Sequence, residues 1–152
     1  MSMTSLLKFL SLKWKTNLKK RALQLPLILL IILWGFTAVH YSDLPTEIPI
    51  HFNAKGVPDG FATRIHCWGM PLFASLLYFG LSVPLKRLGI KESEKKVLFW
   101  TQGIIMGIFF YIQYQSFLVA LGRSEGLGMW FLPFTFLVLL LPVVVGIRQG
   151  KR

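Results

Sequence analysis

Residues 25–33 read Leu-Pro-Leu-Ile-Leu-Leu-Ile-Ile-Leu and lie inside a longer apolar stretch, residues 22–40. A helix rises about 1.5 Å per residue, so roughly 20 apolar residues cross the ~30 Å hydrocarbon core of a bilayer. Similar stretches follow at residues 67–85, 97–121 and 129–147. None of the four contains Asp, Glu, Lys or Arg, whose charge is costly in hydrocarbon. The sequence therefore predicts an all-α membrane protein, a bundle of four transmembrane helices.

Composition supports a membrane environment. Hydrophobic residues make up 54% of the 152 residues, and 17 Lys and Arg against 6 Asp and Glu give a net charge of +11. In a soluble protein such a charge suggests nucleic acid as the partner, but here the hydropathy favours the lipid bilayer and its anionic headgroups. Cys67 is the single cysteine, which excludes an intrachain disulfide and a cysteine-rich metal site.

The basic residues are distributed unequally between the two sides of the predicted bundle. The N-terminal segment, the loop between the second and third stretches, and the C-terminal tail together carry fourteen of them. The other two loops carry three, which are Lys55, Arg64 and Arg123. Cytoplasmic loops are enriched in Lys and Arg, so we expect the N-terminus and the C-terminus in the cytoplasm.

Three regions are distinguished along the chain. Residues 1–21 form a basic amphipathic segment, residues 22–147 the four-helix membrane domain, and residues 148–152 a basic tail. The N-terminal segment is either a helix lying in the membrane interface, which its apolar spacing favours, or a disordered basic leader.

The first apolar stretch could be a cleaved signal peptide or a retained anchor. Its positively charged start fits both alternatives. A cleavage site needs small residues, and Trp34, Phe36 and His40 occupy those places instead. We interpret the stretch as a retained anchor.

The third apolar stretch is the most polar of the four. Gln102 and Gln113 are eleven residues apart and therefore share a helix face, and Gly103 and Gly107 form a G-x-x-x-G step. Small residues let helices approach, and amides form hydrogen bonds across the contact. We expect these four residues to pack helices together, and a polar substrate path is the alternative.

The loop at residues 41–66 carries the most information about function. Ile48, Ile50 and Phe52 alternate with Pro49, His51 and Asn53, which predicts a short strand with one apolar and one polar face. Two turn sequences follow, Asn-Ala-Lys-Gly at residues 53–56 and Val-Pro-Asp-Gly at residues 57–60. We expect a β-hairpin-like extracytoplasmic loop that rests its apolar face on the bundle.

This loop resembles a bacterial membrane domain of unknown function found in Sdp-type toxin-immunity and signalling proteins. The resemblance covers roughly residues 25–85 and rests on the order Leu-Pro, Ile-Pro, His-aromatic, Asn, Gly and Pro-Asp-Gly. Its signature positions correspond to Pro49, His51, Asn53, Gly56, Pro58, Asp59 and Gly60.

The resemblance implies a multi-pass protein of the bacterial plasma membrane. The best-understood members protect the cell from a secreted peptide toxin and sequester a repressor when occupied. This chain departs from them, because it lacks the second half with a Gly-Ile-Arg-Thr/Asn-Pro stretch. Gly-Ile-Arg-Gln at residues 146–149 is too short and too terminal to replace it, which counts against repressor sequestration.

Neither a metal site nor an enzyme is predicted. His40, His51 and His66 lie near carboxylates in the sequence, but no metal-ligand spacing such as H-E-x-x-H is present. No nucleophile has an adjacent base, and no phosphate-binding loop occurs. We therefore expect no cofactor.

Two classes of function remain for a protein of this kind. In the first, the loop binds an extracytoplasmic peptide or protein, as in the immunity type. In the second, the chain is an accessory or structural subunit of a larger membrane complex. The signature residues either bind the partner or only shape the loop.

Overall fold

A computed structural model describes residues 25–87 and 91–150. The amphipathic segment predicted at residues 1–21 lies outside these ranges, as does the end of the basic tail at residues 151–152.

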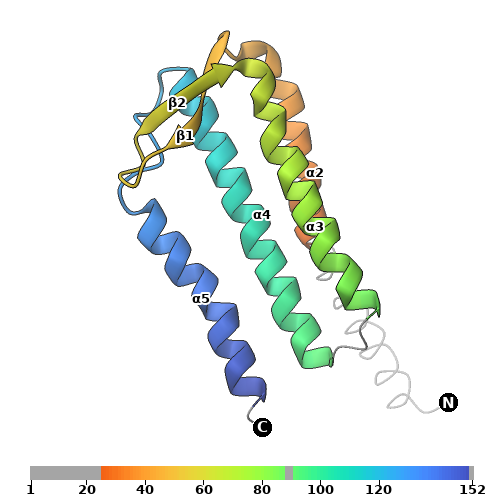
Figure 1. The fold of residues 1–152 in the computed structure, drawn as a ribbon. Coiled ribbons are helices and arrows are strands. Elements are labelled where there is room, and N and C mark those ends of the chain that lie inside the picture. The colour runs from red at the N-terminus through yellow and green to blue at the C-terminus, as the bar shows by residue number, and fades with distance from the viewer. Residues whose placement is uncertain (1–24, 88–90, 151–152) are drawn as a thin grey trace, which may run out of the picture.

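Four long helices form most of the described chain (Figure 1). They are α2 (Leu25–His40), α3 (Gly69–Arg87), α4 (Glu92–Ala120) and α5 (Phe131–Gly150). Between α2 and α3 the chain forms the helical turn η1 (Tyr41–Asp43), the strands β1 (Glu47–Phe52) and β2 (Pro58–Thr63), and the helical turn η2 (Arg64–Trp68). The predicted helices and the predicted hairpin are therefore confirmed.

The start of α4 differs most from its prediction. The helix begins at Glu92, five residues before the apolar stretch, directly after Lys91 in an extended conformation. Glu94 lies near the helix N-terminus, where negative charge is favourable, and Glu and Lys are good helix formers. The charged segment is thus the polar first part of α4 rather than a loop.

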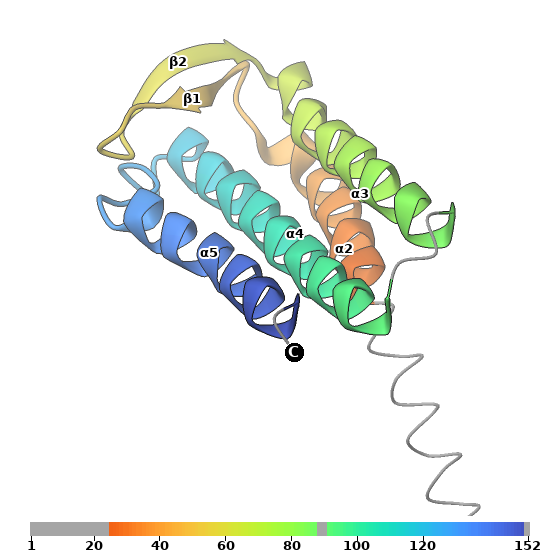
Figure 2. The ribbon, with the colours of Figure 1, turned by 60° about the horizontal axis from the view of Figure 1, so that its bottom comes forward.

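The helix α4 is the centre of the bundle. It packs against α2, α3 and α5, while α5 packs mainly against α4. Figures 1 and 2 show α5 on one side of α4, with α2 and α3 on the other side. The hairpin lies over one end of the bundle, which we call the hairpin end. There β1 contacts the end of α4.

The core is small, and many apolar side chains face outward. Leu30, Leu33, Ala74 and Met106 form the buried cluster between α2, α3 and α4. By contrast, Ile31, Leu76 and Phe136 are 61%, 71% and 66% exposed. A helix that is apolar on all sides needs apolar surroundings, which the small core does not supply. These helices therefore fit a lipid environment.

Within the described residues, three helical segments are long and apolar enough to cross a membrane: Leu25–Asp43, Arg64–Ser82 and Glu94–Ala120. The apolar part of α5, Phe131–Gly146, is shorter. At 1.5 Å per residue it extends about 24 Å, less than the ~30 Å of a hydrocarbon core. The structure therefore supports a membrane protein with three candidate spans, and the predicted count of four is not confirmed.

Polar side chains join the helices inside the bundle. Gln113 of α4 donates from Nε2 to Thr37 Oγ1 in α2 (3.1 Å) and to the Cys67 carbonyl oxygen (3.0 Å). Gln102 donates to Ser82 Oγ in α3 at 3.0 Å. Buried amides with partners on neighbouring helices stabilise one packing arrangement.

The two glycines of the G-x-x-x-G step lie in different surroundings. A Cβ atom on Gly103 would lie 4.0 Å from Pro26 Cγ in α2. A Cβ atom on Gly107 would meet nothing within 4 Å, and this residue borders a space between α4 and α5. The step is therefore not a single close contact between two helix backbones.

Candidate functional site

The hairpin has an irregular register. Strands β1 and β2 pair antiparallel, and regular pairing runs from Glu47 opposite Thr63 to Pro49 opposite Phe61. The next pair is His51 with Gly60, so Ile50 bulges out of β1, and Asp59 bulges out of β2 one step later. Pro49 has no N–H to donate, and bulges are where strands accommodate such residues.

The bulges break the predicted alternation of β1. Ile48 and its neighbour Pro49 are both buried, whereas Ile50 is 51% exposed. Of the side chains predicted to rest on the bundle, Ile48 is therefore buried there, whereas Ile50 remains half exposed. A one-residue bulge shifts every later side chain relative to the faces of the strand.

A single turn closes the hairpin. Asn53 Oδ1 accepts hydrogen bonds from the backbone N–H groups of Lys55 (2.9 Å) and Val57 (3.2 Å). The Gly56 N–H donates to the Asn53 carbonyl oxygen at 2.8 Å, and Gly56 has a φ of 76°. Asn53 therefore shapes the turn with its side chain, as short amides commonly do.

The second predicted turn, residues 57–60, is absent. Pro58, Asp59 and Gly60 belong to β2, with Pro58 as its first residue. The first position of a strand is one of the few that tolerate proline. Because the Asn53 turn already reverses the chain, the Pro-Asp-Gly sequence starts the returning strand.

His51 and Asp59 form a pair on the exposed face of the hairpin. His51 Nδ1 lies 2.5 Å from Asp59 Oδ1, and their side chains are 69% and 41% exposed. A Cβ atom on Gly60 would lie 2.9 Å from His51 Cβ. Gly60 has no positive φ, so its backbone conformation does not require glycine. Glycine is required because the His51 side chain occupies the space that a Cβ atom would need.

The tip of the hairpin is attached to the loop between α4 and α5. The Leu127 N–H donates to the Gly56 carbonyl oxygen at 2.8 Å. A Cβ atom on Gly56 would lie 2.7 Å from the Gly128 carbonyl oxygen, and one on Gly126 would overlap the Gly56 oxygen. Tyr111 of α4 donates from its hydroxyl to the Leu127 carbonyl oxygen at 3.0 Å. This contact fixes the hairpin at its tip.

The base of the hairpin is held by a second apolar cluster. Leu44, Ile48, Cys67 and Phe117 are buried together, at the junction of the hairpin with the ends of α2 and α4. The hydrogen bond from Gln113 to the Cys67 carbonyl oxygen lies directly beneath. Attachment at both tip and base makes the hairpin a fixed part of the fold.

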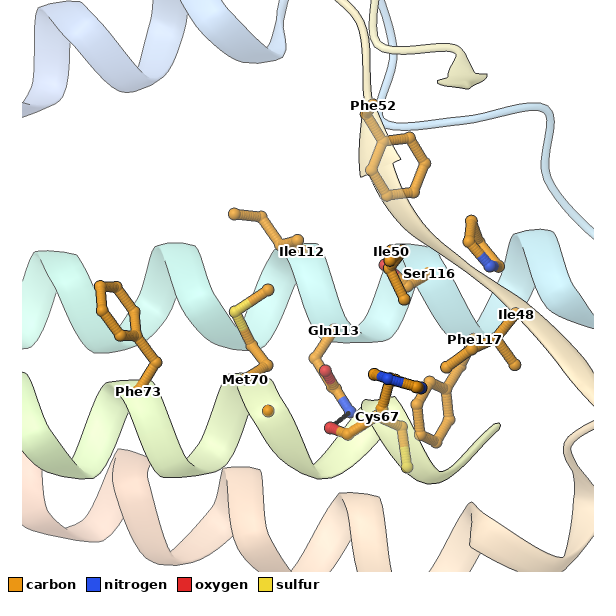
Figure 3. Close-up of a pocket in the computed structure, with 13 residues that line it drawn as sticks. Ile48, Ile50, Phe52, Cys67, Met70, Phe73, Ile112, Gln113, Ser116 and Phe117 are labelled. Atoms are coloured by element: carbon orange, nitrogen blue, oxygen red, sulfur yellow. Dashed lines mark hydrogen bonds between the residues drawn. The ribbon is translucent and has the colours of Figure 1, made fainter. Parts of the chain in front are cut away.

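A groove lies between the fixed hairpin and the bundle (Figure 3). Its volume is about 330 Å³, and residues of β1, η2, α3 and α4 border it. The main apolar ones are Ile48, Ile50, Phe52, Met70, Phe73 and Ile112. The polar residues Ser116 and His66 also line the groove. A mostly apolar groove with a few polar groups is typical of binding sites.

The signature residues differ in their relation to this groove. Pro49 lines it. Asn53 and Gly56 form the turn, while His51, Asp59 and Gly60 lie together on the exposed side of the hairpin. The apolar groove residues on α3 and α4 were missed by sequence reasoning, because apolar residues within apolar helices give no local signal. The Gly-Leu-Gly sequence at residues 126–128 was the one visible sign of the contact at the tip.

The three histidines have separate local partners. His40 Nδ1 lies 3.3 Å from Asp43 Oδ2, His51 contacts Asp59, and His66 Nδ1 lies 3.0 Å from the Thr63 carbonyl oxygen. Within residues 25–87 and 91–150, no three His, Cys, Asp or Glu side chains are grouped to hold a metal ion.

Comparison with known proteins identifies one family model. Residues 28–74 match the domain of unknown function DUF1648, a range that includes most of α2, the whole hairpin and the first residues of α3. A protein of the archaeon Archaeoglobus fulgidus, described as uncharacterized, is 38% identical over 61 residues, which is 40% of this chain. The matched part spans about a third (33%) of that relative. No solved structure matches. The part of the chain that is similar to this family thus contains the hairpin and the groove residues of β1, η2 and α3, whereas the groove residues of α4 lie outside it.

Proposed function

We propose that this chain is a small multi-pass protein of the bacterial plasma membrane whose extracytoplasmic hairpin binds a peptide or protein partner. The observation that carries the proposal is the groove beneath the hairpin. Its walls come from four elements, β1, η2, α3 and α4, and the hairpin is held at both tip and base. A pre-formed site avoids the entropic cost of ordering a loop upon binding.

The chemistry of the groove favours an apolar segment of a partner. Ile50 and Phe52 present apolar surface from the hairpin, and Met70 presents a flexible side chain from α3. Methionine adapts to differently shaped apolar partners. Ser116 and His66 supply polar groups that would orient the partner's backbone. A secreted peptide with apolar side chains, as in the immunity type, fits this description.

The orientation of the protein is part of the same proposal. Fourteen Lys and Arg residues belong to the segments expected at the end opposite the hairpin, and three belong to the two loops at the hairpin end. The positive-inside rule then directs the hairpin outward and both termini inward. This orientation requires α5 to span the membrane despite its short apolar part. Shorter helices do so by local thinning of the bilayer.

A second candidate function is that of an accessory subunit in a larger membrane complex. A space of about 540 Å³ between α4 and α5 favours it, because α5 packs mainly on α4. Gly107 and Tyr111 border this space, together with residues of α5. A helix of another membrane protein would fill it.

Two serine variants test the first candidate against the second. Ile50 lines the groove, and Ile65 has a similar exposure (57% against 51%) but does not line it. In mild detergent from its native host, Ile50→Ser should lose the co-purified partner, while Ile65→Ser keeps it. Both variants should melt within a few degrees of the wild type. If a partner remains bound to Ile50→Ser, that partner does not bind in the groove. If this partner is a membrane protein present in stoichiometric amount, the result supports the second candidate.

A further inference from the structure

A second hollow lies at the hairpin end, on a different part of the surface from the groove. It has a volume of about 520 Å³ and lies where α2 and α4 end. The candidate spans Leu25–Asp43 and Glu94–Ala120 both stop at this level. A site at the end of two spans lies at the depth of lipid headgroups.

The hollow has an aromatic wall and a charged rim. Phe36 packs against Tyr114 with ring centroids 5.9 Å apart, and against Phe117 at 5.2 Å. His40, Asp43 and Arg123 line the same space. An apolar wall below a charged rim is suited to a molecule with an apolar body and a charged head.

The backbone around Arg123 is fixed by the end of α4. The Arg123 N–H donates to the Leu118 carbonyl oxygen (2.8 Å), and the Gly122 N–H donates to that of Val119 (3.0 Å). Gly122 has a φ of 67°. These bonds make a Schellman motif, the common helix ending with glycine in the left-handed conformation. Arg123 therefore emerges from a defined position at the rim.

The polar groups of the rim are available to a ligand. In the part of the chain that the structure describes, the Arg123 guanidinium has no ion pair, and the Tyr114 hydroxyl has no hydrogen bond. Asp43 is held by His40, with 3.3 Å between Oδ2 and Nδ1, and both side chains stay partly exposed. The rim thus offers a cation, a hydroxyl and a positioned carboxylate.

We propose that this hollow binds the headgroup of a zwitterionic phospholipid such as phosphatidylethanolamine. The Arg123 guanidinium binds the phosphate, because its planar fork of donors matches phosphate oxygens. The hydroxyl of Tyr114, which lines the same hollow, adds a donor. Asp43 accepts from the ammonium group, and His40 positions Asp43. The acyl chains then run along the aromatic wall, past Phe36, toward the membrane interior.

Native mass spectrometry of the full chain in detergent tests this site. The probes are phosphatidylethanolamine, phosphatidylglycerol and glycerophosphoethanolamine, which has the same headgroup without acyl chains. Wild type should bind one phosphatidylethanolamine more tightly than any further copies. Arg123→Gln should weaken that first binding by about tenfold or more, and Arg123→Lys should weaken it less.

Two further variants isolate the role of each charge. Lys55 lies on the hairpin turn outside the hollow, so Lys55→Gln removes the same charge from the same end of the molecule and should leave binding unchanged. Asp43→Asn should weaken phosphatidylethanolamine but not phosphatidylglycerol, which has no ammonium group. Equal melting temperatures confirm that all variants fold.

Four results would overturn the proposal. Arg123→Gln could bind the first phosphatidylethanolamine as the wild type does, or Lys55→Gln could weaken it equally. Glycerophosphoethanolamine could compete at the same concentration as the lipid, which would identify a site for soluble phosphoesters instead. Asp43→Asn could leave the preference for phosphatidylethanolamine unchanged, which would show that Asp43 does not bind the ammonium group.

Discussion

The backbone N–H of Leu127 donates to the carbonyl oxygen of Gly56 across 2.8 Å, which joins the hairpin turn to the loop between α4 and α5. These residues are far apart in sequence and belong to different loops. The contact holds the hairpin over the groove, so it connects local turn geometry to the proposed binding site. Glycine at positions 56 and 126 allows the two backbones to approach, because a Cβ atom at either position would overlap the opposite backbone.

Replacing Gly56 should destabilise the protein. The residue has a φ of 76°, and a Cβ atom would lie 2.7 Å from the Gly128 carbonyl oxygen. A β-branched side chain in the left-handed region costs about 1–2 kcal/mol, before the overlap with Gly128 is added. Gly56→Val should therefore lower the free energy of unfolding by about 2 kcal/mol or more, measured by thermal unfolding in detergent.

The matched control for Gly56→Val is Gly35→Ala in α2. A Cβ atom on Gly35 meets nothing within 4 Å, and alanine favours helices by up to ~1 kcal/mol. This variant should be as stable as the wild type or slightly more stable. Wild-type stability of Gly56→Val would show that the turn contact does not hold the hairpin.

The effect of replacing Gly60 should depend on the His51 side chain rather than on the backbone conformation of Gly60. An added Cβ atom would lie 2.9 Å from His51 Cβ, so Gly60→Ala should cost about 1–3 kcal/mol through overpacking. Removing the opposing Cβ atom in His51→Gly should relieve part of that cost. A double-mutant cycle should thus give a coupling energy of at least ~0.5 kcal/mol. Strictly additive effects would argue against the observed register.

Asn53 and His51 should differ in their effect on stability. Asn53 Oδ1 accepts two backbone hydrogen bonds within the turn, so Asn53→Ala should lower stability by about 1–2 kcal/mol. His51 contacts Asp59 on an exposed surface, where pairs contribute at most ~1 kcal/mol. His51→Ala should therefore stay close to the wild type in chemical or thermal unfolding. The reverse order would show that the exposed pair, and not the turn, is structural.

Reporter fusions test the orientation and the fourth span together. A phosphatase that is active only outside the cytoplasm should be active when inserted within residues 54–59 and inactive after Arg152. The basic residues of the C-terminal tail favour its retention in the cytoplasm. High phosphatase activity at the C-terminus would mean that α5, with its shorter apolar part, does not cross the membrane.

The helices and the existence of the hairpin could be predicted because their signals are local. Four charge-free apolar stretches indicate α2, α3, α4 and α5, and the Asn-x-x-Gly sequence indicates the turn at Gly56. The bulges at Ile50 and Asp59 could not be predicted, since a bulge depends on how both strands pair. The Pro-Asp-Gly sequence at residues 58–60 is compatible with a turn as well as with a strand start.

The groove and the contact at the hairpin tip depend on long-range packing. Met70 and Ile112 are ordinary apolar residues within apolar helices, and only the placement of β1 across the end of α4 makes them line a groove. Gln113 was predicted to pack helices, but the sequence did not identify its partners, Thr37 and Cys67, which lie on other elements. A single sequence contains no pairing information of that kind.

Site-specific photo-crosslinking in the native host tests the central claim most directly. A photoreactive phenylalanine derivative at position 50 faces the groove, and the same group at position 65 lies outside it with similar exposure. We expect irradiation to yield a discrete crosslinked product with a peptide or protein at position 50 and none at position 65. No product at position 50, or the same product at both positions, would contradict a partner-binding groove beneath the hairpin.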